Sequence, residues 1–218
     1  MTKAFAEIAF TPAVRAMQTK QGSAQGYEKF LAAEAERSDR LSEQEAAFIA
    51  ARDGFYQATV SETGWPYVQF RGGPVGFLKV LDAKTIAFAD FRGNRQYISA
   101  GNLTTNDRIA LILMDYPNRR RLKLWGRVRL IDAKQDPALI GALREEGYRA
   151  LPERAMVITV EALDWNCPQH IPQRFTIEEI GESLELLRAE NAQLHREATR
   201  LREEVARLRT APASDGVS

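Results

Sequence analysis

Residues 55–89, FYQATVSETGWPYVQFRGGPVGFLKVLDAKTIAFA, decide the fold class. Short runs of β-branched and aromatic residues alternate here with segments rich in glycine, proline and polar residues, which predicts strands joined by tight turns. Further strand-like runs follow at 108–115 (RIALILMD), 120–131 (RRLKLWGRVRLI) and 155–163 (AMVITVEAL). Frequent turns with few helices between the strands favour an antiparallel barrel over a parallel sheet.

The run 120–131 also predicts which side of its strand is buried. Leu122, Leu124, Val128 and Leu130 alternate there with basic residues and Trp125, so one face is apolar and the other basic. The arginines resemble a nucleic-acid patch, but their alternation fits the solvated face of a barrel strand.

Helices are predicted on both sides of these strands. From Thr11 to about Asp53 the apolar spacing is helical, and Ser42 with Glu45 forms a capping box that opens a helix. A shorter helix is expected from Pro137 to about Glu146.

From Ile177 onward the pattern is that of a coiled coil. Heptad positions a and d are occupied without a break, a by Ile177, Leu184, Asn191, Ala198 and Val205, and d by Ile180, Leu187, Leu194, Leu201 and Leu208. The g residues Glu190, Glu197 and Glu204 precede the e residues His195, Arg202 and Arg209 by five positions, which is the pairing of a parallel two-stranded coil. The alternative is a single amphipathic helix packed on its own barrel.

Composition limits the partners and the compartment. The 218 residues carry 30 Lys and Arg against 29 Asp and Glu, so there is no global field to recruit nucleic acid or an anionic membrane. The sequence has one cysteine, Cys167, no signal peptide and no apolar run long enough for a membrane span. We therefore expect a cytoplasmic protein.

Three segments are candidates for chemistry. In QFRGGPVGFLK (69–79) glycines allow a ligand close to the backbone beside Arg71, although a glycine-rich hairpin looks the same. In FADFRGNRQYISAGNL (88–103) the loop residues Arg92, Asn94, Arg95 and Gln96 enter a predicted helix whose free amides favour an anion, and the alternative is a solvated arginine loop. The third segment, DWNCPQHIPQRF (164–175), gathers polar side chains between two prolines.

Two further interpretations of this third segment are weak. Cys167 and His170 are too few for a structural zinc site, because only His195 remains elsewhere, so no metal site is expected. A nucleophilic pair of Cys167 and His170 lacks any supporting signature around it.

Four ordered motifs carry a resemblance to a known family: PYVQFRGGPVGFLKVLD, FADFRGNRQYISAGNL, DYPNRRRLKLWGRVRLI and DWNCPQHIPQRF. Together they resemble the FMN-binding split-barrel proteins related to pyridoxamine 5′-phosphate oxidase, in an oxidase-like subgroup, from about Phe10 to Phe175. The resemblance implies a mainly β (α+β) fold: a six-stranded Greek-key split barrel that binds FMN at a homodimer interface. The sequence departs from pyridoxamine 5′-phosphate oxidase itself in three places. Gly93-Asn94-Arg95 replaces its Ser-Arg-Lys phosphate loop, and Arg121 replaces a flavin-contacting glutamine. The CPQH segment (167–170) stands where the oxidase has a substrate-binding arginine-histidine signature.

The resemblance also implies the site residues. FMN would contact Gln69, Phe70, Arg71, Gly72, Arg92, Asn94, Arg95, Gln96, Arg121, Trp165, Asn166, Gln169 and Arg174, with His170 as a candidate proton donor. The expected function is that of an FMN-dependent oxidoreductase acting on a small-molecule substrate or electron donor. The alternative is a flavin or haem protein that binds or senses its cofactor without turnover and uses the coil for interactions.

The expected organisation therefore has four parts. These are an N-terminal helical extension (1–54), the FMN-binding barrel (55–175), the coiled coil (176–210) and a disordered tail (211–218). Homodimers would form through both the barrel and the coil.

Overall fold

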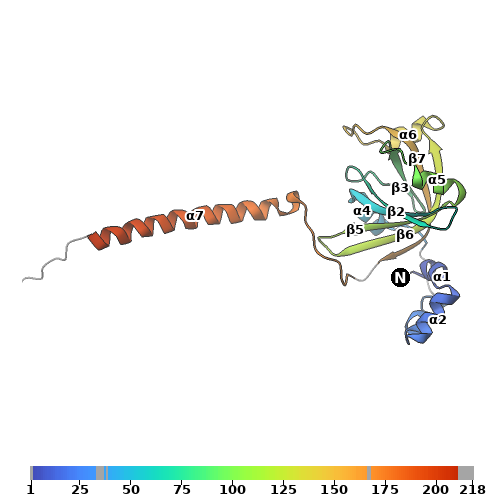
Figure 1. Cartoon of the computed structure of the whole chain (residues 1–218), viewed down its shortest axis with the longest axis horizontal. Coiled ribbons are helices and arrows are strands. Elements are labelled where there is room, and N and C mark those ends of the chain that lie inside the picture. Colours follow the sequence, from blue (N-terminus) through green and yellow to red (C-terminus); the bar gives the residue numbers. More distant parts are fainter. Residues whose placement is uncertain (1, 33–36, 38, 166–167, 211–218) are drawn as a thin grey trace, which may run out of the picture. The chain divides into compact units, whose positions relative to one another are not determined.

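The computed structural model describes residues 2–32, 37, 39–165 and 168–210, and the chain divides into two compact units, residues 1–172 and 173–218 (Figure 1). The predicted tail, 211–218, lies outside the described residues. The helices of the first unit are α1 (Lys3–Ala9), α2 (Pro12–Lys20), α3 (Ala24–Glu28), α4 (Glu43–Ala50), α5 (Ile98–Thr105) and α6 (Pro137–Leu143). Its strands are β1 (Gly54–Val60), β2 (Pro66–Gly72), β3 (Lys79–Asp82), β4 (Thr85–Phe91), β5 (Arg108–Asp115), β6 (Arg120–Asp132) and β7 (Pro152–Trp165).

The strands form one antiparallel sheet in the order β2-β1-β5-β6-β7-β4-β3. Each strand-like run of the sequence is a strand, so the antiparallel prediction is confirmed. The expected number of six strands is wrong, because the short run at β3 pairs with β4 as a seventh, edge strand.

The sheet is rolled around its core. Three strands separate β1 from β4 in the hydrogen-bonding order, yet Phe55 of β1 and Phe88 of β4 meet edge to face with ring centroids 5.2 Å apart. Phe77, between β2 and β3, stacks on Phe55 at 5.6 Å. The two ends of the sheet are therefore brought near each other, and we call the region between β2 and β4 the seam.

The two faces of the sheet differ in the way that β6 predicts. Leu122, Leu124 and Val128 are buried in the core, which confirms the apolar face, while Arg121 and Lys123 point to the other side. Directly paired residues share a face, so the pairing of β5 with β6 and with β1, and of β1 with β2, defines one outer surface. This outer face carries Val68, Phe70, Tyr56, Ile112, Met114 and Arg121.

The helices largely follow their local signals. Ser42 and Glu45 form the predicted capping box at the start of α4. The helix predicted from Pro137 begins there but ends at Leu143, earlier than expected. Helix α1 lies within the predicted extension 1–54 but before the helical spacing that starts at Thr11, and it packs Phe5 against Trp125 of β6 with ring centroids 4.5 Å apart.

The described part of the second unit consists mainly of one long helix. Helix α7 (Ile177–Thr210) has 34 residues and begins where the heptad pattern begins. Thr176 and Glu179 cap it reciprocally: the Thr176 N–H donates to Glu179 Oε2 (2.7 Å), and the Glu179 N–H donates to Thr176 Oγ1 (3.2 Å). Among the helices of the described ranges, none combines the length and apolar character that crossing a membrane requires.

Candidate functional site at the seam of the sheet

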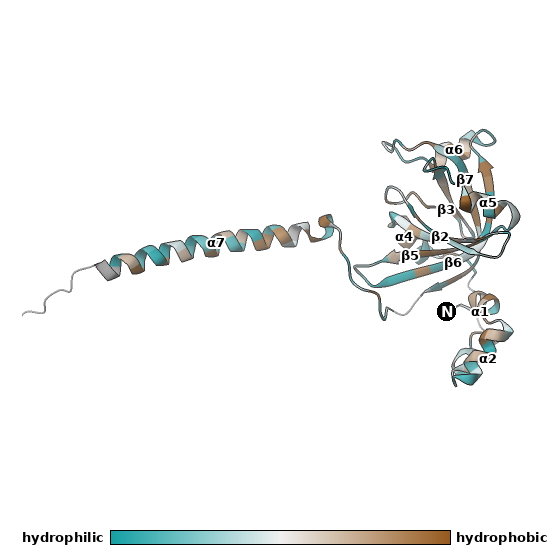
Figure 2. Cartoon of the chain, in the orientation of Figure 1, coloured by the Kyte–Doolittle hydropathy of each residue, from teal (hydrophilic) through white to brown (hydrophobic). Residues whose placement is uncertain are grey.

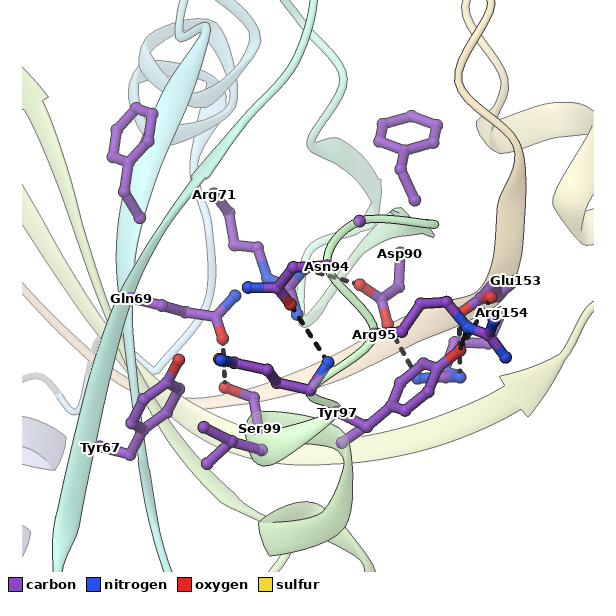
Figure 3. Close-up of a pocket in the computed structure, with 16 residues that line it drawn as sticks. Tyr67, Gln69, Arg71, Asp90, Asn94, Arg95, Tyr97, Ser99, Glu153 and Arg154 are labelled. Atoms are coloured by element: carbon purple, nitrogen blue, oxygen red, sulfur yellow. Dashed lines mark hydrogen bonds and ion pairs between the residues drawn. The ribbon is translucent and has the colours of Figure 1, made fainter.

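A polar pocket of about 230 Å³ lies at the seam. Its walls come from β2, the end of β4, the loop 93–97, the first turn of α5 and the start of β7. Figure 3 shows side chains from these elements directed into one space. Residues far apart in sequence meet here because rolling of the sheet brings β2 close to β4 and β7.

Arg71 is held rigidly on the β2 side of the pocket. Its Nη1 lies 2.7 Å from Asp90 Oδ1. The amide of Gln69 is oriented with its oxygen toward Arg71, where it accepts from Nε (2.7 Å) and Nη2 (3.2 Å), and its nitrogen then lies 2.9 Å from Ser99 Oγ. A guanidinium bonded on both sides in this way is fixed before any ligand arrives.

Asp90 joins two arginines across the seam. Its Oδ2 accepts from Arg154 Nη1 at 3.0 Å, while its Oδ1 pairs with Arg71. Burial raises the pKa of Asp90, and the charges of Arg71 and Arg154 oppose that rise. The carboxylate therefore orders the pocket at a desolvation cost.

The loop before α5 presents Arg95 to the pocket. Arg95 and Tyr97 both have left-handed backbone conformations, with φ of 61° and 53°, which are uncommon for residues other than glycine and which favour a functional role. Arg95 Nε donates to Tyr97 Oη (3.4 Å), and Tyr97 Oη donates to Glu153 Oε1 (3.1 Å). Asn94 Oδ1 accepts from the Gln96 N–H (3.2 Å), which shapes the turn.

The first turn of α5 completes the pocket. Ile98, Ser99 and Ala100 line it, and the N-cap residue Tyr97 makes no side-chain cap hydrogen bond. The first amides of a helix have no acceptor within the helix, and its dipole adds partial positive charge at this end. This turn can therefore donate backbone hydrogen bonds to an anion.

The charges of the pocket suit an anion such as a phosphate monoester. Three arginines, Arg71, Arg95 and Arg154, line it together with two carboxylates, Asp90 and Glu153, which leaves a net positive charge beside the helix terminus. The donor set fits the phosphate end of FMN. Pockets that enclose whole small-molecule ligands are usually about 300–1,000 Å³, so the seam pocket of one chain suits part of such a ligand.

The structure brings together about half of the predicted site residues. The pocket is lined by Gln69, Phe70, Arg71, Asn94, Arg95 and Gln96. Gly72 and Arg92 adjoin these residues in sequence but are not among the lining residues, and Arg92 Nε lies 3.7 Å from Glu153 Oε1.

The other predicted residues lie away from this pocket. Trp165 packs under α4, where its Nε1 donates to Glu45 Oε1 (2.6 Å) and its ring lies edge to face with Phe48 (4.8 Å). Arg121 is on the outer face, and its buried Nε has no hydrogen-bond partner among the described residues. The remaining residues are Gln169 and His170, both exposed beyond β7, and Arg174, which belongs to the second unit.

Two predictions in the third segment concern residues beyond the structure's described ranges. Asn166 and Cys167 are both outside them. Within those ranges, no three His, Cys, Asp or Glu side chains are grouped so that they could hold a metal ion.

Sequence reasoning missed Asp90, Tyr97, Glu153 and Arg154. Each stands in or beside a strand or helix where a single polar residue has no local signal of function. Asp90 lies in the quoted motif at the end of β4, but only the pairing of β4 with β7 places it opposite Arg154.

One known protein family matches the larger part of the chain. Residues 41–167 match the family described as pyridoxamine 5′-phosphate oxidase, which is more than half of the chain. No curated protein matches.

Several solved structures are similar at low identity. HupZ of Group A Streptococcus is 16–18% identical; its 1.70 Å structure has a TM-score of 0.46 at 18% identity, covering 62% of this chain and 100% of its own. A protein related to general stress protein 26 from Clostridium acetobutylicum is 19% identical over 63% of this chain and 94% of its own, with a TM-score of 0.43. An FMN-binding protein from Syntrophomonas wolfei is 11% identical over 68% of this chain and 97% of its own, with a TM-score of 0.45. On the match over residues 41–167, the chain belongs to the pyridoxamine 5′-phosphate oxidase family.

Proposed function

We propose that this protein is an FMN-dependent oxidoreductase whose seam pocket holds the phosphate of FMN. The observation that carries the proposal is the convergence of Arg71, Arg95 and the first turn of α5 on one pocket, in a chain of this family. Bound flavin would supply the hydride or electron chemistry, and the protein would supply position and charge.

Each wall of the pocket has a part in holding the phosphate. Arg71, fixed by Gln69 and Asp90, contributes a charge of set orientation. Arg95 is exposed, so its guanidinium can turn toward a ligand, and the amides at Ile98 to Ala100 point along the helix axis. In this proposal the rolled sheet would correspond to the split barrel that the sequence motifs imply.

The binding site for the flavin ring would be completed by residues of a second copy of the chain. Pocket residues Gln69 and Arg71 are on the core side of β2, since Gln69 pairs with the buried Gln57 and Arg71 with the buried Phe55. Arg121 is on the opposite face, paired with Met114 beside an apolar surface. If two outer faces pack together, Arg121 of one chain can reach the ligand of the other.

The first test is the cofactor itself. The purified full-length protein should show a flavin absorbance spectrum, or should regain one when FMN is added, and the released cofactor should be FMN. Because the pocket selects a phosphate, riboflavin should bind at least about tenfold more weakly than FMN, a difference near 1.4 kcal/mol. Absence of bound or rebindable flavin would refute the proposal.

Variants test the placement of the phosphate. Arg95→Met should reduce FMN affinity and remove the preference over riboflavin, while Arg129→Met, an exposed arginine of β6, serves as the matched control. Anaerobic reduction by nicotinamide, deazaflavin or small-molecule donors tests turnover. A protein that binds FMN but is reduced by none of these donors would be a flavin carrier or sensor, and the oxidoreductase assignment would be wrong.

A further inference from the structure

Helix α7 carries a narrow apolar stripe that is exposed in the single chain. The d-position residues Leu187, Leu194 and Leu201 are 55%, 54% and 48% exposed, and Val205 at position a is 47% exposed. Figure 2 shows hydrophobic and hydrophilic residues alternating along the length of the helix. In a helix of about 50 Å, a regular apolar stripe at a and d suits a coiled-coil seam rather than a broad packing face, and the exposed Leu186, at position c, lies outside this stripe.

We propose that α7 pairs with α7 of a second copy of this chain as a parallel, in-register, two-stranded coiled coil. The charges at positions g and e of α7 support this partner and this orientation. In a parallel pair each g residue faces the following e residue of the other helix, so Glu190 meets His195 and Glu197 meets Arg202. An antiparallel pair brings g against g and e against e, which places glutamates on glutamates and arginines on arginines.

Asn191 specifies the register of this pair. It occupies position a in the middle of α7, between Leu184 and Ala198 at the neighbouring a positions. In register, two Asn191 amides face each other and can hydrogen-bond, whereas a shift of one heptad buries each amide against Leu184 or Ala198. A single polar a residue thus lowers stability but selects the in-register dimer.

The relative orientation of the two α7 helices determines how many chains can assemble. Only residues 173–176 separate the first unit from α7, so a parallel coil holds the first units of both chains at the same end. The same two chains can then also pair through their sheets and form a closed dimer. An antiparallel coil would hold the first units at opposite ends of a rod of about 50 Å, and sheet pairing would then link further chains.

Disulfide cross-linking in the full chain tests the pairing. In a Cys167→Ser background, Leu187→Cys and Leu201→Cys should each cross-link to themselves under mild oxidation, because both positions face their own copies in a parallel, in-register coil. Glu203→Cys, at the outward f position, is the matched control and should cross-link at least about tenfold less. An antiparallel pair can bring at most one of the two d positions against itself, so cross-linking at only one of them would overturn the proposal.

Two further measurements keep the result independent of folding and of the flavin site. Asn191→Leu should raise the melting temperature of the helical signal and add trimers or larger species in light scattering, whereas a helix packed on its own chain would show no new oligomer. Cross-linking at 187 and 201 should persist whether or not the protein binds FMN. Absence of cross-linking at both positions, in variants that retain their helical signal, would refute the coil and leave the proposed flavin site untouched.

Discussion

Asp90 orders the pocket more than it stabilises the fold. Its carboxylate bridges Arg71 and Arg154, but burial raises its pKa, so its ionised form is less favoured in the folded chain than in the unfolded one. Between the ordinary and the raised pKa the folded state binds more protons, and its stability therefore falls as pH rises through that window. We infer that the charge is retained because it orients the arginines.

Asp90→Asn should lower FMN affinity without destabilising the fold at neutral pH. We expect about a tenfold loss of affinity, near 1.4 kcal/mol, because asparagine keeps one acceptor oxygen but loses the charge that holds Arg71 and Arg154 together. Arg71→Met should cost at least as much, and the double variant should bind no more weakly than Arg71→Met alone. Fluorescence titration of FMN measures all three variants.

The control for Asp90→Asn is Asp107→Asn, which breaks the exposed pair of Asp107 with Arg127. That variant should leave FMN affinity unchanged. Additive losses in the double variant would show that Asp90 does not act through Arg71.

Glu45 is a residue whose charge stabilises the fold. Burial alone would raise its pKa, but hydrogen bonds from Ser42 and Trp165 outweigh that effect and lower the pKa below its ordinary value. The unfolded state therefore binds more protons between the two values, so this contribution to stability is complete above the ordinary pKa and is lost as pH falls through the lowered one.

Glu45→Gln should destabilise the protein by about 1.5–3 kcal/mol at neutral pH, the usual range for hydrogen bonds to a charged group. The difference from the wild type should shrink as the solution is made acidic, and denaturant unfolding at several pH values measures it. Glu43→Gln, at an exposed position in the same turn of α4, should cost only a few tenths of a kcal/mol. A loss from Glu45→Gln that did not change with pH would contradict the assigned role of its charge.

Among the elements, the long pair of β6 and β7 depends on one close approach. The register of this pair shifts between Trp125 and Gly126, and a Cβ built on Gly126 would lie 2.4 Å from the carbonyl oxygen of Thr159. Glycine is required here because the backbones of the two strands come too close for any side chain.

Gly126→Ala should therefore destabilise the sheet by about 1–3 kcal/mol, as overpacked sites usually do. Gly141→Ala in α6 is the matched control, since its added Cβ would meet nothing within 4 Å and alanine favours a helix by about 0.5–1 kcal/mol. Thermal unfolding of both variants measures the two changes in stability. Equal melting temperatures for Gly126→Ala and the wild type would show that the strands can separate without cost.

For the molecule as a whole, the outer face of the sheet and α7 are two surfaces that one chain leaves exposed. Val68 and Phe70 of β2 are 61% and 59% exposed, and Tyr56 beside Phe70 is 40% exposed. An apolar surface of this kind on a sheet is typical of an interface. Pairing of this surface would place Arg121 against a second chain and would connect assembly with flavin binding.

Val68→Lys should disrupt that pairing and reduce FMN affinity together, because a charge in the middle of an apolar interface is costly to desolvate. Light scattering and FMN titration measure the two effects. Both are measured in a Leu194→Asp background, because a charge at this d position should prevent dimerisation through α7. Leu81→Glu, at an exposed position of the edge strand β3, is the control and should change neither. Full FMN affinity in a monomeric variant would show that one chain suffices for the site.

Local sequence patterns determined most of the secondary structure. The alternation along β6, the capping box of α4 and the start of α7 were predictable because each depends on residues within one or two turns or along one strand. The cationic part of the pocket was also predictable in outline, since Arg71 and Arg95 stand in glycine-containing segments that lead into a strand end and a helix.

Only the tertiary structure decided which distant residues share a site. Rolling of the sheet brings β2 to β4 and places Asp90 between Arg71 and Arg154, and no local pattern encodes that contact. The arrangement of the strands also places Trp165 against Glu45 of α4 and Arg121 on the outer face. Neither residue lies in the pocket, although the resemblance implies that both contact FMN. The spacing of apolar residues indicates which side of a strand or helix is buried. Which residues lie against that side depends on how the whole sheet closes on its core.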